Sequence, residues 1–177
     1  MIIAIAGNRY SGKFTLSKIL GGLGFCDYNF SVLDEPKLEL ETLLRSKTGI
    51  SPFTVDYEQR LLIDDFIYSY KNLIEKTDKN YWLNKLEYKI KDIDNTKSVI
   101  IIRDINTLEE FNWAWQKNIL TIYVTRYNKD GAIIEGFMNK NYNWSHKLLW
   151  PTSNDIEFLT SAVQLQLKEL LNLINKQ

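Results

Sequence analysis

The first fifteen residues constrain the fold of this chain more than any other segment. Residues 2–6 are a short apolar run, typical of a strand buried on both faces, and Gly7 ends it. Residues 13–20 follow with a helical pattern. The seven residues 7–13 read Gly-Asn-Arg-Tyr-Ser-Gly-Lys, so the strand and the helix are joined by a turn with a glycine near each end. A strand, a Gly-containing turn and a helix in this order predict an α/β architecture.

This turn has the residue types that a phosphate-binding loop needs. Gly7 and Gly12 let the backbone curl so that several N–H groups point inward, and the following helix offers its positive end to an anion. Lys13 adds a full charge for the β- and γ-phosphates of a nucleotide. The alternative is an ordinary turn with a solvated lysine. The residues expected to bind the nucleotide here are Gly7, Asn8, Tyr10, Ser11, Gly12, Lys13, Phe14 and Thr15.

Composition narrows the function classes. The chain has 177 residues, enough for one domain over 1–177, and 22 basic residues balance 22 acidic ones. A net charge of zero gives no global attraction to nucleic acid or to an anionic membrane, so no direct nucleic-acid binding is expected. The chain has one cysteine, Cys26, and one histidine, His146. These counts argue against an internal disulfide, a Cys/His metal site and a Ser/His triad. No transmembrane run or signal peptide is evident, which favours a cytoplasmic protein.

The rest of the chain alternates strand-like and helical stretches, which predicts a central, mainly parallel sheet. Thr107 and Glu110 have capping-box spacing at the start of a further short helix. Residues 126–150 are polar, aromatic and irregular, and we expect a long loop or lid there. The predicted strands are 2–6, 25–30, 98–102 and 119–124, and the main predicted helices are 13–20, 38–47, 57–74, 81–93 and 156–174.

The loop resembles one specific family. Ser11-Gly12-Lys13-Phe14-Thr15 is similar to the S-G-K-x-T loop of phage deoxynucleoside monophosphate kinases, in which the variable residue is often Asp. Shorter segments resemble that family in the same order along nearly the whole chain. They are Asp34-Glu35-Pro36-Lys37-Leu38, Asn80-Tyr81-Trp82-Leu83 with Leu86, Ile102-Arg103-Asp104-Ile105, Val124-Thr125-Arg126 and Ser153-Asn154-Asp155.

The resemblance implies a three-layer P-loop fold of the nucleotide kinase type. It implies transfer of the γ-phosphoryl group of ATP to a deoxynucleoside monophosphate, with Mg²⁺, small nucleotides as partners, and the host cytoplasm as the location if a phage encodes the chain. A homodimer is compatible with the resemblance and with the many aromatic residues. Lys37 and Arg60 are expected to contact the acceptor nucleotide; for Arg60, a solvated helix arginine is the alternative.

Phosphoryl transfer needs aligned phosphates and neutralised charge, and the carboxyl ends of parallel strands are where such sites form. Thr15 and Asp104 are the candidate ligands of Mg²⁺, and Asp104 is also a candidate substrate contact. Besides Lys13, Arg9 in the loop and Arg126 at a strand end are candidate catalytic cations. Asn154 and Asp155 either border the adenine or cap the last helix.

Two departures from the family keep other functions open. Phe14 replaces the common Asp, and Asn106 or Thr107 stands where the family has the Arg of D-V-R. A nucleotide-binding protein with impaired catalysis is therefore one alternative. A P-loop kinase for another small phosphorylated acceptor is the other.

Overall fold

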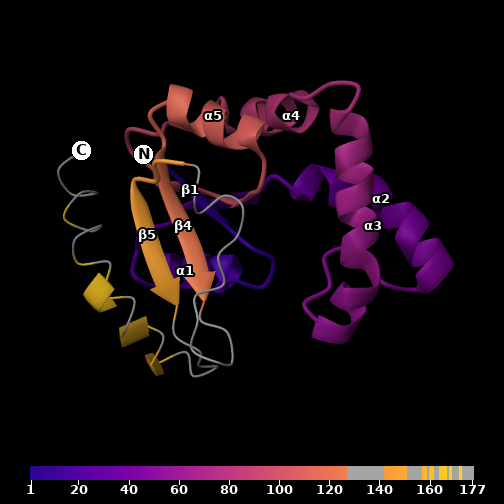
Figure 1. The fold of residues 1–177 in the computed structure, drawn as a ribbon, viewed down its shortest axis with the longest axis horizontal. Coiled ribbons are helices and arrows are strands. Elements are labelled where there is room, and N and C mark those ends of the chain that lie inside the picture. Colours follow the sequence, from indigo (N-terminus) through magenta and orange to yellow (C-terminus); the bar gives the residue numbers. More distant parts are fainter. Residues whose placement is uncertain are drawn as a thin grey trace. The chain divides into compact units, whose positions relative to one another are not determined.

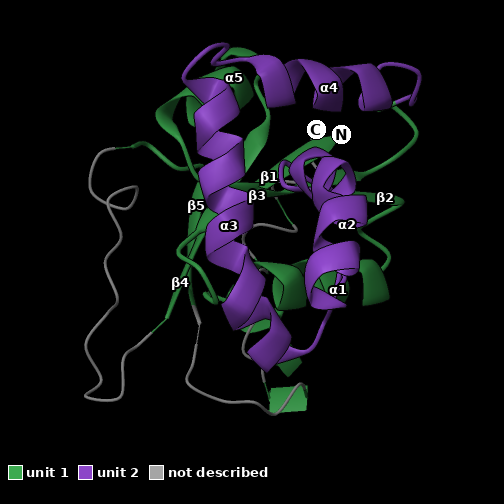
Figure 2. Cartoon of the chain, turned by 90° about the vertical axis from the view of Figure 1, so that its right-hand side faces the viewer, with its two compact units in different colours: residues 1–29, 95–177 green, residues 30–94 purple. Residues whose placement is uncertain are grey.

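The computed structural model describes residues 1–126 and 142–150 and several positions between 157 and 172. The chain divides into two compact units (Figure 2). Unit 1 comprises residues 1–29 and 95–177, and unit 2 comprises residues 30–94. The expected single domain over residues 1–177 stays a prediction.

A five-stranded sheet confirms the α/β prediction. Its strand order is β2-β3-β1-β4-β5, and β1 pairs in parallel with both β3 and β4, as does β4 with β5 (Figure 1). The central strand β1 is buried from Ile3 to Ala6, as its unbroken apolar run predicts. The strands are β1 (Ile2–Gly7), β2 (Tyr28–Ser31), β3 (Ile100–Ile105), β4 (Leu120–Arg126) and β5 (His146–Trp150).

Two helices cover opposite faces of the sheet in unit 1 (Figures 1 and 2). The chain leaves β1 through α1 (Lys13–Gly22) toward β2, whereas it leaves β3 through α5 (Leu108–Gln116) in the other direction, toward β4. Because crossovers between parallel strands are right-handed, these two connections must lie on different faces. The result is three layers, helix, sheet and helix, as predicted.

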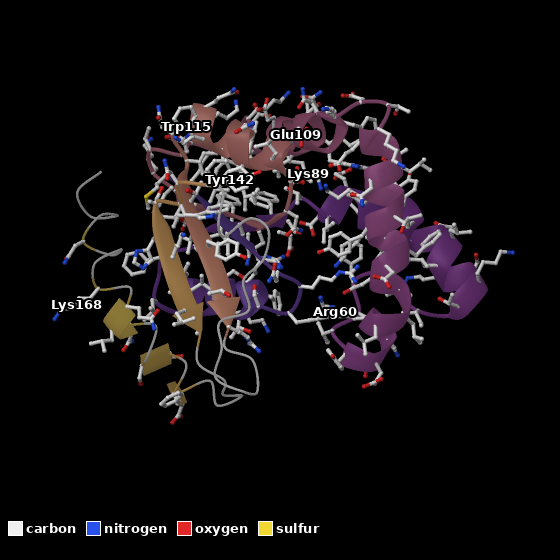
Figure 3. The ribbon with its side chains drawn as sticks, viewed as in Figure 1. Arg60, Lys89, Glu109, Trp115, Tyr142 and Lys168 are labelled. Carbon is white, nitrogen blue, oxygen red and sulfur yellow. The ribbon has the colours of Figure 1, made fainter. Side chains whose placement is uncertain are left out.

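Each face of the sheet has its own core. On the α1 side, Leu16, Leu20 and several strand residues, among them Ile3 and Ile122, form one buried cluster. On the α5 side the packing is aromatic: the Trp144 ring lies 4.7 Å from that of Phe111 and 5.3 Å from that of Tyr123, between ring centroids. Tyr142 lies below α5 in the same group, while Trp115 projects from α5 into solvent (Figure 3).

The capping box of α5 forms as predicted. The Thr107 hydroxyl accepts a hydrogen bond from the Glu110 N–H at 3.2 Å, and the Glu110 carboxylate accepts one from the Thr107 N–H at 2.9 Å. These two bonds satisfy backbone donors that the first turn leaves without helical partners. The start of α5, and with it the end of the loop after β3, is therefore fixed by local sequence.

Unit 2 contains three helices, α2 (Asp34–Thr48), α3 (Tyr57–Glu75) and α4 (Tyr81–Ile90). The predicted helices match α3 closely. The helix expected to begin at Pro36 and to continue over 38–47 begins two residues earlier, at Asp34, and α4 ends three residues earlier than predicted. Pro36 lies in the first turn of α2, where its missing N–H costs no helical bond. The Trp82 indole donates to the Lys71 carbonyl at 3.1 Å. Leu40, Leu44, Ile63 and Ile67 form one buried cluster of this unit.

One part of the lid prediction is wrong. Residues 146–150 form the edge strand β5 rather than a loop, whereas residues 127–141 lie outside the described residues. Leu148 of β5 is fully buried against β4, and the Thr121 and Ser145 hydroxyls bond each other near its start. This strand was not predicted because it begins with the polar residues His146 and Lys147, and polar or charged residues are common in edge strands.

The backbone is helical at every described position from 157 to 172, in agreement with the predicted last helix. The Gln166 amide in this segment donates to the Leu149 carbonyl of β5 at 3.0 Å. Among the described helices, none has the length and apolar character needed to cross a bilayer.

Candidate nucleotide-phosphate site

The loop between β1 and α1 is tightly bound to the sheet. Gly7 has a φ of 144°, and a Cβ there would lie 2.2 Å from the carbonyl oxygen of Val124 on β4. Only glycine permits this approach. Tyr10 and Gly12 also have positive φ, 58° and 101°, so the backbone is left-handed at both positions before the helix begins. The loop is curled in the way that the two glycines predict.

Lys13 is held over the start of the loop by its own neighbours. Its side chain is only 6% exposed, and its ammonium donates to the Gly7 carbonyl at 3.0 Å and to the Asn8 carbonyl at 2.8 Å. The same nitrogen lies 3.5 Å from the Asp104 Oδ1 atom. A buried ammonium needs such partners. Lys13 therefore lies at the carboxyl end of β1, as predicted, and its role in binding phosphate stays a prediction.

Asp104 reaches Lys13 because of an irregularity in β3. Ile5 pairs with Arg103 and Ala6 pairs with Ile105, so Asp104 is an extra residue in the ladder. Its φ of 66° is unusual for a residue with a side chain. Bulges of this kind redirect side chains beside functional sites, and here the carboxylate is directed to the phosphate loop.

One polar atom inside the loop is unsatisfied. The Ser11 side chain is 4% exposed, and its Oγ has no hydrogen-bond partner among the described residues. A buried hydroxyl without a partner costs free energy. This hydroxyl lies inside the curled loop beside Gly7, where a Cβ on Gly7 would be 2.6 Å from it. An anion in the loop would give it an acceptor.

Arg126 joins the loop from the end of β4. Its Nε donates to the Ser11 carbonyl at 3.2 Å. Burial lowers the pKa of the Arg126 guanidinium, although the group remains charged at neutral pH because the ordinary pKa of arginine is far above 7. Arg126, a candidate catalytic cation, thus contacts the loop through the Ser11 carbonyl, and Arg9 is an exposed residue of the same loop. The catalytic roles of both arginines stay predictions.

The side chains predicted to hold Mg²⁺ do not form a ready metal site. Phe14 offers no ligand oxygen directly after Lys13, and Thr15 stands one helical position further on. The Asp104 carboxylate lies between two cations, with Lys13 at 3.5 Å and the Arg103 Nη1 atom at 3.9 Å. Mg²⁺ demands near-ideal oxygen geometry, and these contacts place cations where it would have to bind.

Of the remaining predicted residues, two belong to unit 2 and two lie outside the described residues. Lys37 and Arg60 belong to unit 2, where the Arg60 guanidinium lies 3.5 Å from the Asp64 carboxylate on α3 (Figure 3). The Lys37 ammonium lies 5.8 Å from the centre of the Phe53 ring. Asn154 and Asp155 lie outside the described residues. The roles of these four residues stay predictions.

Three residues at the site were missed or underrated by sequence reasoning. The Arg103 guanidinium stacks on Phe14, 5.1 Å from its ring centre, and Arg103 Nε donates to the Asn29 Oδ1 atom at 2.8 Å. Asn29 in turn donates to Ser17 at 3.1 Å. A usable signal was the two-residue period of β3, which puts Arg103 on the same face as the buried Ile101 below α1.

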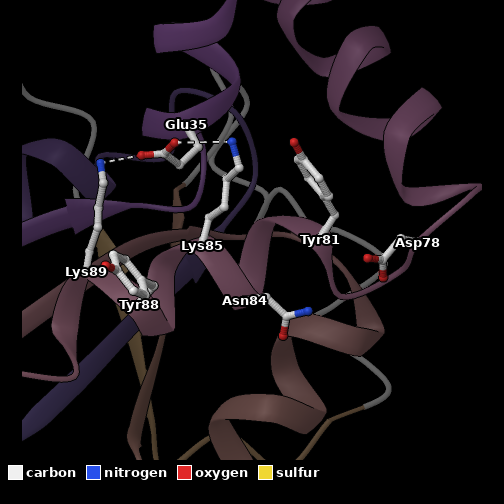
Figure 4. Close-up of a pocket in the computed structure, with 7 residues that line it drawn as sticks. All are labelled: Glu35, Asp78, Tyr81, Asn84, Lys85, Tyr88 and Lys89. Carbon is white, nitrogen blue, oxygen red and sulfur yellow. Dashed lines mark ion pairs between the residues drawn. The ribbon is translucent and has the colours of Figure 1, made fainter.

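A separate hollow of about 430 Å³ lies entirely within unit 2 (Figure 4). Its two lysines already have carboxylate partners: Lys89 pairs with Glu35, and Lys85 pairs with both Glu35 and Glu39. Nothing in these contacts selects a ligand. The hollow is lined by Glu35, Asp78, Tyr81, Asn84, Lys85, Tyr88 and Lys89.

Comparison with known proteins gives one sequence relative of note. No family model matches the chain. The ribose import ATP-binding protein RbsA of Clostridium tetani is 31% identical over 115 residues, which is 59% of this chain and 22% of that protein. The chain thus spans about a fifth of the length of this curated relative.

Solved structures that align with this chain include two kinases. The Thermus thermophilus protein TT1252 aligns with a TM-score of 0.48 and 18% identity over 96% of this chain and 97% of its own. The dephospho-CoA kinase of Campylobacter jejuni aligns with a TM-score of 0.47 and 14% identity over 96% of both chains. The shikimate kinase of Aquifex aeolicus aligns with a TM-score of 0.41 and 14% identity, over 95% and 96%.

Proposed function

We propose that this protein is a phosphotransferase that moves the γ-phosphoryl group of ATP to a deoxynucleoside monophosphate. The observation that carries the proposal is the curled loop between β1 and α1, with the buried ammonium of Lys13 directly above it. Glycine-rich backbone followed by a helix N-terminus is a general phosphate-binding arrangement. The name of the Clostridium relative includes ATP binding, which supports the same donor nucleotide.

The chemistry asks little covalent work of the protein. A phosphate oxygen of the acceptor bonds to the γ-phosphorus, and the bond from that phosphorus to the β,γ-bridging oxygen breaks, leaving ADP. Lys13 and the loop N–H groups would neutralise charge on the donor phosphates, and the Ser11 hydroxyl would donate to one of their oxygens. Arg126, anchored on the Ser11 carbonyl, would hold the loop in its curled form.

The acceptor is proposed from the family resemblance. Lys37 and Arg60 would then bind the acceptor phosphate, Arg9 the transferring group, and Asn154 and Asp155 the adenine edge. Partners are small nucleotides, and a homodimer and a cytoplasmic location belong to the same proposal.

A coupled assay of ADP release tests the proposal with a panel of deoxynucleoside monophosphates. We expect at least one acceptor to raise ADP release well above the rate without acceptor, and Lys13→Gln to abolish this increase. Shikimate and other small acceptors belong in the same panel, because a P-loop kinase with a different acceptor would respond to those alone. No response to any acceptor, with a folded protein, would contradict the kinase proposal.

A second candidate is a nucleotide-binding protein that has lost catalysis. The specific observation in its favour is Phe14, which occupies the position after Lys13 and presents an exposed ring instead of a hydroxyl. Tight ATP binding in calorimetry without turnover of any acceptor would favour this candidate over the kinase.

A further inference from the structure

Phe14 holds two cations beside the phosphate loop. Its ring is 42% exposed, the Lys18 ammonium lies 4.6 Å from the ring centre, and the Arg103 guanidinium carbon lies 5.1 Å from it. The face of an aromatic ring attracts cations, and arginine stacks on it especially well. Phe14 follows the loop lysine directly, at the position where the general phosphate-loop pattern has a Ser or Thr hydroxyl, and it brings an arginine to that place.

Arg103 is fixed by a closed set of contacts that begins and ends at Phe14. Its Nε donates to Asn29 Oδ1 at 2.8 Å, and Asn29 Nδ2 donates to Ser17 Oγ at 3.1 Å. Ser17 is 1% exposed, and its hydroxyl donates to the Phe14 carbonyl at 2.8 Å. Because the ring and the amide both hold the guanidinium, little rotamer entropy remains to be lost on binding an anion.

The two terminal nitrogens of the Arg103 guanidinium have N–H donors available for a ligand. Its Nη1 lies 3.9 Å from Asp104 Oδ2, well beyond the length of a charge-assisted hydrogen bond. Neither terminal nitrogen of Arg103 hydrogen-bonds to the part of the chain that the structure describes. The other oxygen of Asp104 lies 3.5 Å from Lys13, so one carboxylate lies between the loop lysine and Arg103.

We infer that Arg103 is a phosphate-binding residue of the loop site, and that nucleotide binding here does not depend on Mg²⁺. The guanidinium supplies the positive charge that a hydroxyl-bound Mg²⁺ supplies where Ser or Thr follows the loop lysine. Asp104 neutralises Lys13 and Arg103 until a phosphate replaces it as their partner. Phe14 is a positioning residue that acts through Arg103. This inference rests on the proposed binding of a nucleotide in the loop.

Calorimetric titration of the full chain with ATP tests the inference, once with excess Mg²⁺ and once with EDTA. We expect the wild-type Kd to change less than about threefold between the two media. Arg103→Gln should raise the Kd in EDTA about tenfold or more, since a charge-assisted contact is lost. Phe14→Tyr keeps the ring and should bind like wild type, whereas Phe14→Leu should resemble Arg103→Gln. Phe14→Thr should bind ATP more tightly with Mg²⁺ than with EDTA.

Arg45→Gln is the matched control, because Arg45 is an exposed arginine on α2 that pairs with Glu41. It should leave the Kd unchanged. Wild-type binding only with Mg²⁺, or unchanged binding by Arg103→Gln, would overturn the inference and leave the proposed function standing. If Arg103→Gln does not fold, equal affinities of Phe14→Leu and Phe14→Tyr would overturn it. A wild-type chain that binds no ATP in either medium would overturn both the proposed kinase function and the inference about Arg103. ATP binding without turnover of any acceptor would contradict only the kinase function.

Discussion

The Lys13 ammonium and the Asp104 carboxylate lie 3.5 Å apart although the two residues are 91 positions apart in sequence. Lys13 opens α1, and Asp104 is the extra residue of the bulge in β3. The pair links the loop between β1 and α1 to the neighbouring strand β3, and the ammonium lies between two carbonyl oxygens and a carboxylate. Any anion that enters the loop must compete with Asp104 for Lys13.

Lys13→Gln should lower kcat/KM of the proposed kinase at least about a hundredfold, because removing one preorganised charge at a transferring phosphoryl group costs that much. Circular dichroism should show an intact fold, since Gln can still donate to a loop carbonyl. Steady-state assays with the best acceptor of the panel measure the effect. A decrease under threefold would show that Lys13 does not face the phosphates.

Gly7→Ala should destabilise the protein by at least about 2 kcal/mol. The new methyl group would meet the Val124 carbonyl oxygen at 2.2 Å, and a φ of 144° is strained for any residue with a Cβ. Urea unfolding measures the change. Gly22→Ala is the control. Gly22 lies at the end of α1, and a Cβ there would have no contact within 4 Å outside its own helix, so the free energy of unfolding should stay the same or rise slightly.

Ser11→Ala should separate binding from stability. The Ser11 hydroxyl has no partner among the described residues, so its removal should not lower the free energy of unfolding of the ligand-free protein. The Kd for ATP should nevertheless rise about three- to tenfold, the value of one lost hydrogen bond. Thermal unfolding and calorimetry give the two readouts. Equal affinity of the variant and the wild type would remove Ser11 from the site.

Thr107→Ala should cost about 1 kcal/mol of unfolding free energy, because the first turn of α5 loses its side-chain cap. Thr107→Ser keeps the hydroxyl and should recover most of the loss. Chemical denaturation of the three proteins side by side checks this. If both variants lose the same amount, the capping bond contributes nothing.

Glu39→Gln should flatten the loss of stability in acid. Partial burial raises the pKa of Glu39, but hydrogen bonds from Lys85 and Tyr70 outweigh this and leave the pKa below its usual value of 4.5. A lowered pKa means that the ionised carboxylate stabilises the fold above about pH 4.5, and that this contribution disappears as the pH falls through the lower value. Unfolding free energies between pH 3 and pH 7 should therefore fall less steeply for Glu39→Gln. Parallel curves for both proteins would contradict the role of Glu39.

The hydrogen bond between Tyr70 and Glu39 also affects stability at alkaline pH. The Glu39 carboxylate, which accepts from the Tyr70 hydroxyl at 2.6 Å, raises the pKa of Tyr70 to about 12. The neutral phenol therefore stabilises the fold up to about pH 10, and this stabilisation is lost between pH 10 and pH 12. Tyr70→Phe should show a smaller decrease in unfolding free energy over that interval, measured by denaturation at fixed pH.

Sequence alone determined the features that depend on neighbouring residues. The curled loop between β1 and α1 follows from Gly7, Gly12 and Lys13 because glycine conformation and a helix start are local properties. The buried strand β1 and the capping box of α5 follow for the same reason, since an apolar run and a three-residue spacing are visible in the chain. The three-layer arrangement then follows from the handedness of crossovers between parallel strands.

Tertiary structure decided the features that depend on register and on distant partners. The bulge that directs Asp104 to Lys13 exists only because β3 slips by one residue against β1, and no residue type announces such a slip. β5 escaped prediction because an edge strand with polar residues is defined by the strand it joins. Arg103 contacts Phe14 because β3 and α1 pack together. The two residues are 89 positions apart, so the neighbouring residues of neither one predict this contact.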